Sequence, residues 1–174
     1  MSDQRSSEAT NVIPRAARQS NVLNGVTWEM KRCTFTKKPE TRGFLQLCAD
    51  RRFHRCIQDR FEKDTGLESS DLYWIHADAG GTPKMECSRT APDYCYYDQC
   101  VRLMGWSAHG DDCGGFGHDV PDDEIQRALL VTALRKIDEY PEATHYIYFA
   151  TTVNDGGTWY AVVHCLVCPR VTDQ

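Results

Sequence analysis

Along the chain, segments with short apolar runs alternate with segments in which apolar residues recur at helical spacing. The runs 44–48 and 72–75 are typical of buried β-strands, because apolar runs of this length pack inside a sheet. Between them, the stretch 51–63 has apolar residues four apart on one face of a predicted helix: Phe53, Ile57 and Phe61. The stretch 93–104 fits either a helix or a passage from a helix to a strand.

The second half of the chain continues this alternation. Pro121 and the three acidic residues after it predict the start of a helix over 122–137, since acidic side chains are favoured at the positive end of the helix dipole. The segments 145–150 and 159–163 flank a turn signal at 154–157 and predict a hairpin. The whole pattern predicts an α/β fold with a central, mostly parallel sheet flanked by helices.

Length and charge restrict the class of protein. The 174 residues, of 19.8 kDa, fit one domain, with a polar, flexible N-terminal arm over 1–24 and a single domain over 25–174. The net charge of −5, with no basic block, argues against a nucleic-acid partner. No apolar run approaches the roughly 18–20 residues of a membrane span, so we expect no membrane partner. Without an apolar leader at the start, a cytoplasmic location is expected.

Nine cysteines are the unusual feature of the composition. Their odd number favours free or metal-bound thiols in a reducing compartment. We expect two or three to carry chemistry and the others to pack as small hydrophobic residues. Cys165 and Cys168 form a single CxxC pair at the end of a strand, for which packing is favoured over a second zinc site. Cys95 and Cys100, among tyrosines, favour a core or a subunit interface.

The first group of residues with possible chemistry follows the strand at 44–48. Here Cys48, Asp50 and Arg52 alternate along the chain. Ligands of open α/β sheets bind at the carboxyl ends of strands, where a thiolate would ligate a metal. An arginine beside an aspartate holds that carboxylate ionised and oriented. The alternative is a buried cysteine followed by a charged helix start.

The second group is the glycine-rich stretch 105–118, which we interpret as a loop because it has five glycines. His109 and Cys113 would share a zinc ion with the distant Cys48, and His118 is a reserve ligand. Three protein ligands leave a fourth position for water, which is typical of a catalytic zinc site. The alternative is a flexible loop with solvated histidines.

Together these motifs resemble the β-class carbonic anhydrase family. The family's Cys-x-Asp-x-Arg motif corresponds to Cys48, Asp50 and Arg52; its Ala-Gly segment corresponds to 78–81, and its Gly-His-x-x-Cys-Gly motif is similar to 105–114. The resemblance covers about residues 43–165 in the same order and extends to the limiting-CO2-inducible branch of this fold. Two differences stand out: one extra residue between the histidine and the cysteine, which requires a bulge, and Asp78 in place of the usual asparagine.

The resemblance implies a zinc-dependent carbonic anhydrase, in which zinc-bound hydroxide hydrates CO2 reversibly to bicarbonate. The metal ligands would be Cys48, His109 and Cys113. Asp50 would orient the hydroxide, and Arg52 would keep Asp50 charged and away from the metal. The family also implies a homodimer with each active-site cleft at the subunit interface. Two other histidines, His54 and His76, are candidates for carrying protons to and from the site. The simpler interpretation, which we favour, places each of them at the surface or in the core.

Two alternatives keep the zinc site. One is hydrolysis of carbonyl sulfide or carbon disulfide, favoured by an apolar pocket mouth around Phe116 and Trp106. The other is a non-catalytic, zinc-binding regulatory protein on the same scaffold, which the longer spacing between His109 and Cys113 favours.

Overall fold

The structure is a computed structural model that describes residues 22–23, 26–27, 40–88 and 90–170. It divides into two units, residues 1–37 and 38–174. In the first unit, β1 (Val22–Leu23) pairs antiparallel with β2 (Val26–Thr27). Apart from β1, the flexible arm predicted over 1–24 lies outside the described residues.

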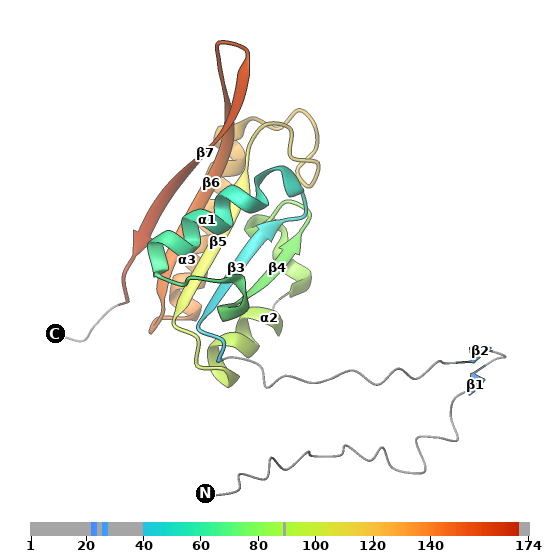
Figure 1. The fold of residues 1–174 in the computed structure, drawn as a ribbon, viewed down its shortest axis with the longest axis vertical. Coiled ribbons are helices and arrows are strands. Elements are labelled where there is room, and N and C mark those ends of the chain that lie inside the picture. Colours follow the sequence, from blue (N-terminus) through green and yellow to red (C-terminus); the bar gives the residue numbers. More distant parts are fainter. Residues whose placement is uncertain (1–21, 24–25, 28–39, 89, 171–174) are drawn as a thin grey trace, which may run out of the picture. The chain divides into compact units, whose positions relative to one another are not determined.

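The second unit contains one five-stranded sheet with helices on both faces (Figure 1). Its elements are, in chain order, β3 (Gly43–Cys48), η2 (Arg51–Phe53), α1 (His54–Thr65), η3 (Ser70–Leu72), β4 (Tyr73–Asp78), η4 (Thr82–Ser88), α2 (Thr90–Asp93), η5 (Tyr94–Asp98), β5 (Leu103–His109), α3 (Asp122–Glu139), β6 (Thr144–Asp155) and β7 (Thr158–Cys168). The strand order is β4-β3-β5-β6-β7; the first four strands are parallel, and β7 runs antiparallel to β6. This confirms the predicted α/β class with a mostly parallel, helix-flanked sheet.

The two faces of the sheet carry separate apolar cores. Alternate residues of β3 point to opposite faces, so that Leu45 and Leu47 pack with α1, whereas Phe44 and Cys48 pack with α3. In Figure 1, α1 lies on the near face and α3 on the far face. The sheet is therefore covered on both sides over its central strands, as expected for parallel strands.

Strand β5 corrects the interpretation of 105–118 as a loop. Residues 103–109 lie in the middle of the sheet, between β3 and β6. Gly105 suggested a loop, but it is needed for close packing, because a Cβ atom there would be 2.6 Å from the Cδ1 atom of Leu45 and 3.0 Å from Phe61. The ambiguous stretch 93–104 proves to be a passage from a π-helical turn, η5, to this strand.

The connections that follow the neighbouring strands β3 and β5 run to opposite sides of the sheet, which leaves a position for a binding site between them. From β3 the chain passes through α1 to β4 on one side, whereas from β5 it passes through α3 to β6 on the other side. The segments that follow β3 and β5 therefore diverge at the carboxyl ends of two neighbouring strands. Crevices at such points are where open α/β sheets bind ligands.

A partly buried carboxylate, Asp64, links α1 to strands β6 and β7. Asp64 accepts hydrogen bonds from Arg60 Nε at 2.8 Å, from the Tyr148 hydroxyl at 3.2 Å and from the Cys165 thiol at 3.3 Å. Burial alone raises the pKa of Asp64, but these three donors outweigh burial and lower it. The ionised Asp64 therefore stabilises the fold above its ordinary pKa of about 4, and this stabilisation is lost as the pH falls through the lowered value.

We expect Asp64→Asn to lower the free energy of unfolding by about 1–3 kcal/mol at neutral pH, because the substitution leaves buried donors without a charged acceptor. The difference from the wild type is expected to shrink towards about pH 3. Urea unfolding at both pH values measures it. The matched control is Asp59→Asn on the same helix. Asp59 forms an exposed ion pair with Arg55, which contributes at most about 0.5 kcal/mol to the free energy of unfolding. Equal losses in the two variants would contradict the anchoring role.

Among the described residues, no helix combines the length and apolarity that crossing a membrane requires.

Candidate metal centre

Three buried side chains meet at the carboxyl ends of β3 and β5. Cys48 is the last residue of β3, His109 is the last residue of β5, and Cys113 lies in the segment after β5. Their ligand atoms all lie within 4.8 Å of one another, and the two sulfur atoms are 3.9 Å apart. In a tetrahedral zinc site with Zn–S bonds of about 2.3 Å, two sulfur ligands are about 3.8 Å apart. The three predicted ligands therefore form a buried group that could hold a metal ion.

The imidazole of His109 is oriented so that only one of its two ring nitrogens has a hydrogen-bond partner. Its Nδ1 atom lies 2.6 Å from the carbonyl oxygen of Gly110, to which it donates, and its ring stacks on Phe53 with 4.7 Å between centroids. The residue is fully buried, and Nε2 is the one buried side-chain nitrogen or oxygen of the described residues without a hydrogen-bond partner. A buried lone pair without a partner is costly, and a metal ion is the partner that such a histidine usually has.

Cys48 is placed to be a thiolate. The Cys113 thiol donates to its sulfur, and the backbone amides of Gly80 and Asp50 lie 3.3 and 3.5 Å from the same atom. These donors outweigh burial and lower the pKa of Cys48 far below its usual range, whereas the adjacent Cys48 thiolate raises the pKa of Cys113. Metal ligation requires thiolates, so the site already provides the first of them.

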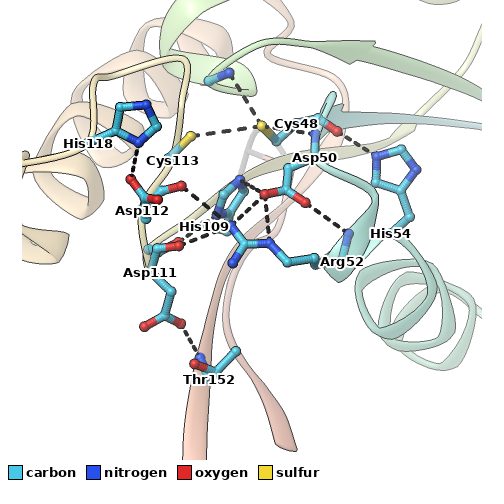
Figure 2. A network of polar contacts seen from close by, with 12 residues as sticks. Cys48, Asp50, Arg52, His54, His109, Asp111, Asp112, Cys113, His118 and Thr152 are labelled. Atoms are coloured by element: carbon cyan, nitrogen blue, oxygen red, sulfur yellow. Dashed lines mark hydrogen bonds and ion pairs between the residues drawn. The ribbon is translucent and has the colours of Figure 1, made fainter. Parts of the chain in front are cut away.

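Asp50 and Arg52 form a fixed pair beside the three ligands (Figure 2). Arg52 donates to Asp50 Oδ2 through Nε at 2.8 Å and through a terminal nitrogen at 2.6 Å, and its backbone amide donates to Oδ1 at 3.0 Å. This guanidinium lowers the pKa of Asp50. Asp50 Oδ2 also lies 3.7 Å from His109 Nε2. An ionised carboxylate is therefore held next to the position that a metal would occupy.

The extra residue between His109 and Cys113 is absorbed by backbone conformation. Asp111 and Asp112 adopt left-handed backbone angles, with φ of 53° and 64°. Aspartate tolerates this region better than most residues. These left-handed residues lie where the longer spacing predicts a bulge, and Cys113, which follows them, contacts Cys48.

Contacts from both sides fix this bulge. Arg52 donates to the carbonyl oxygens of Asp111 and Asp112 at 3.0 and 3.4 Å, so that one side chain links the segments after β3 and β5. The Asp111 amide donates to Asp122 Oδ1 at 2.9 Å, and the Thr152 amide donates to the Asp111 carboxylate. Figure 2 shows Arg52 beside Asp111 and Asp112, and Thr152 at the carboxylate of Asp111.

The other predicted histidines lie outside the ligand cluster. His118 is exposed and pairs with Asp112 at 2.6 Å, so it is not needed as a reserve ligand. His54 contacts the carbonyl oxygen of Cys48 through Nε2 at 2.5 Å. His76 lies 3.2 Å from Gln46 Oε1 and 3.4 Å from the carboxylate of Asp78.

Two expectations about neighbouring residues change. Trp106 does not line a pocket mouth: it is fully buried under α3, and its indole donates to His145 Nδ1 at 2.9 Å. Cys165 and Cys168 lie against opposite faces of the sheet, because residues three apart in a strand point in opposite directions, so they do not share a metal site. Packing accounts for this pair, as it does for the buried Cys95, whereas Cys100 is exposed.

A close backbone contact of the kind that the glycines of 105–118 suggested supports the candidate ligands. A Cβ atom on Gly115 would lie 2.2 Å from the amide nitrogen of Gly80 and 2.4 Å from the carbonyl carbon of Ala79. Gly115 lies two residues after Cys113, and the Gly80 amide donates to Cys48, so both glycines support candidate ligands. The sequence shows the glycines themselves, but it does not show that the loop with Gly115 lies against the loop with Gly80.

We expect Gly115→Ala to weaken zinc binding at least about tenfold, because the methyl group would displace the Gly80 amide from Cys48. Gly114→Ala is the matched control, since a Cβ atom on Gly114 meets nothing within 4 Å. Competition with a chromophoric chelator measures both affinities. Unchanged affinity in Gly115→Ala, with the fold intact by circular dichroism, would remove this supporting role.

Comparison with known proteins adds no family: no protein-family description matches the sequence, and no match is found among curated proteins. The resemblance to β-class carbonic anhydrases therefore stays a prediction that rests on the motifs.

Proposed function

We propose that this protein is a zinc-dependent carbonic anhydrase of the β-class type, which interconverts CO2 and bicarbonate. One observation carries the proposal: an ionised carboxylate, Asp50, is held by Arg52 beside a buried Cys48–His109–Cys113 cluster instead of inside it. Three protein ligands plus a nearby carboxylate are typical of a zinc site that keeps one position open.

The donor set fits zinc, since two thiolates and one imidazole nitrogen are ligands that zinc prefers. When bound, zinc would supply a hydroxide nucleophile at neutral pH by lowering the pKa of water to near 7. Cys48, Cys113 and the unpartnered Nε2 of His109 would hold it. Gly110 fixes the imidazole through Nδ1, which leaves Nε2 free to ligate.

Asp50 would act as the acceptor that orients the nucleophile. Its Oδ2 atom receives two bonds from Arg52, which keep the carboxylate ionised at neutral pH. Because Arg52 also binds the carbonyl oxygens of Asp111 and Asp112, its position is fixed from the opposite side of the site. The pair therefore supplies a fixed acceptor next to the reacting atoms.

The test combines stopped-flow CO2 hydration with zinc analysis by atomic emission on one preparation of the full chain. We expect about one zinc per chain and fast hydration that azide inhibits. A preparation with no zinc would overturn the metal assignment. Zinc with no hydration between about pH 7 and 9 would overturn the enzyme and favour the candidate below.

A second candidate is a non-catalytic zinc protein in which Asp50 is the fourth ligand. The observation in its favour is the distance of 3.7 Å from Asp50 Oδ2 to His109 Nε2, since ligand atoms of a tetrahedral zinc site lie about 3.3 Å apart. Asp50→Asn separates the two: it would weaken zinc binding strongly in this candidate, but leave binding nearly unchanged and abolish hydration in the enzyme. Hydrolysis of sulfur analogues of CO2 loses one half of its original argument, because Trp106 is buried, whereas Phe116 stays half-buried close to Gly80.

A further inference from the structure

A cavity lies between helix α3 and the short helix η4. Its volume is about 370 Å³, which is within the range of small-molecule sites. Three of its lining residues belong to η4: Thr82, Pro83 and Met85. The other four are three and four positions apart on α3, so they share one stripe of that helix: Thr132, Arg135, Lys136 and Glu139. None of the three candidate metal ligands lines this cavity.

The α3 wall of the cavity carries a buried cation. Lys136 is only 5% exposed, and its ammonium nitrogen lies 2.5 Å from Glu139 Oε2 and 5.6 Å from the centre of the Tyr140 ring. An ammonium group has three N–H donors, and within the described part of the chain Glu139 is the one hydrogen-bond acceptor that it meets. Buried charged groups are costly unless their donors are satisfied. The remaining donors of Lys136 therefore favour a further acceptor in the cavity.

Three other residues add donors to the walls. Arg135 is exposed, and no other described residue forms an ion pair with it. The fully buried Thr82 accepts a hydrogen bond from the Ser107 amide at 2.9 Å, which fixes this wall to β5 and leaves the hydroxyl proton available for donation. The half-buried Thr132 adds a second hydroxyl. The cavity thus offers mainly hydrogen-bond donors to a ligand.

The charges on the walls favour an anion. Among the described residues, the lining includes two cations, Arg135 and Lys136, and one carboxylate, Glu139, which is already paired with Lys136. This leaves one positive charge in excess, although the whole chain has a net charge of −5. A ligand with a single negative charge would balance it. Arginine can also bind a carboxylate through two parallel N–H bonds.

We propose that this cavity binds a small monocarboxylate with a short apolar tail. The carboxylate would lie between Arg135 and Lys136, within reach of the threonine hydroxyls, and the tail would pack on Pro83 and Met85. A dianion such as phosphate would leave one negative charge unbalanced and could not use the apolar part of the wall. The inference does not rest on zinc or on the proposed enzymatic function, because the cavity shares no residue with the ligand cluster.

The experiment is an NMR titration of the isotope-labelled full chain at constant ionic strength. The probes are butyrate, acetate, inorganic phosphate and butylammonium. We expect butyrate to cause saturable shifts of the backbone amides of Thr82, Met85 and residues 132–139. Its dissociation constant should be at least about fivefold lower than those of acetate and phosphate, because two more methylene groups are buried than with acetate. Butylammonium, which has a four-carbon tail and the opposite charge, should cause no saturable shift there.

A charge variant tests the carboxylate contact. Arg135→Gln is expected to raise the dissociation constant of butyrate at least about tenfold, since hydrogen bonds to charged groups are among the strongest. Arg127→Gln is the matched control: it removes the same charge from an exposed position of the same helix that does not line the cavity. This control should stay within about twofold of the wild type. Because both arginines are exposed, both variants should fold, which circular dichroism checks.

A second set of amides separates this cavity from the metal centre. The amides of His109 and Cys113 report on a carboxylate that binds at the candidate metal ligands. Saturable shifts at those two residues alone, or none at the cavity, would overturn the proposal. Phosphate binding more tightly than butyrate, or equal losses in Arg135→Gln and Arg127→Gln, would also overturn it. Zinc content of the same samples shows whether the metal assignment holds independently.

Discussion

Replacing Cys48 by serine is expected to reduce bound zinc from about one ion per chain to near zero. The serine hydroxyl stays protonated at neutral pH, whereas the Cys48 sulfur receives donors from Cys113, Gly80 and Asp50 that favour its ionised form. The substitution also leaves His109 Nε2 without a shared ion. We expect affinity for zinc to fall more than about 100-fold, which exceeds the usual effect of changing a supporting residue. Chelator competition and atomic emission measure it.

Cys113→Ser is expected to have the same effect, since its sulfur lies 3.9 Å from that of Cys48. The matched control is Cys56→Ser: this half-buried thiol donates to the carbonyl oxygen of Phe53 at 3.1 Å, and a hydroxyl can make the same bond. Cys56→Ser should therefore keep its zinc and its fold. Full zinc retention in both Cys48→Ser and Cys113→Ser would refute the ligand assignment.

Arg52→Ala is expected to keep zinc and to lose at least about 100-fold in CO2 hydration. The substitution removes both side-chain donors to Asp50 Oδ2. The carboxylate is then free to rotate towards His109 Nε2, which lies 3.7 Å from Oδ2. It also removes the link to the carbonyl oxygens of Asp111 and Asp112. Loss of orientation at this distance is sufficient for a change of that size. Stopped-flow assays on zinc-loaded protein measure the change in kcat/KM.

The neighbouring Arg51 supplies the control, because it is exposed and lies one residue away on the same short helix. Arg51→Ala should leave hydration within about twofold of the wild type. Arg52→Lys tests geometry against charge: lysine keeps the charge but cannot donate through two nitrogens at once, so hydration should recover only in part. Undiminished turnover in Arg52→Ala would remove the role assigned to this pair.

The elements predicted best are those whose local pattern and burial agree. The helix predicted over 122–137 is α3, because its acidic first turn and its apolar face, which packs on the sheet, give the same signal. The final hairpin was predicted too short: β6 extends to Asp155, and β7 runs from Thr158 to Cys168. Strand β5 was missed in part because Gly105 resembles a loop residue.

The candidate site could be predicted for its residue types, but not for its arrangement. The Cys-x-Asp-x-Arg spacing already places Asp50 and Arg52 in reach of each other within one short segment. The bulge at Asp111 and the contact of Gly115 with Gly80 depend on loops that are distant in sequence, and no local periodicity encodes them. Trp106 was misplaced because strand direction, and not proximity to His109 in the chain, decides which way it points.

A metal ion held by Cys48 and Cys113, which are distant in sequence, would link metal supply to the stability of the folded chain. Cys48 and Cys113 are 65 positions apart, and their contact exists only after β5 has inserted beside β3. An ion that bridges them binds the native state in preference to the unfolded chain, and so stabilises it in proportion to the logarithm of the free ion concentration. Zinc starvation would then reduce the amount of this protein through unfolding and proteolysis, in addition to any loss of activity.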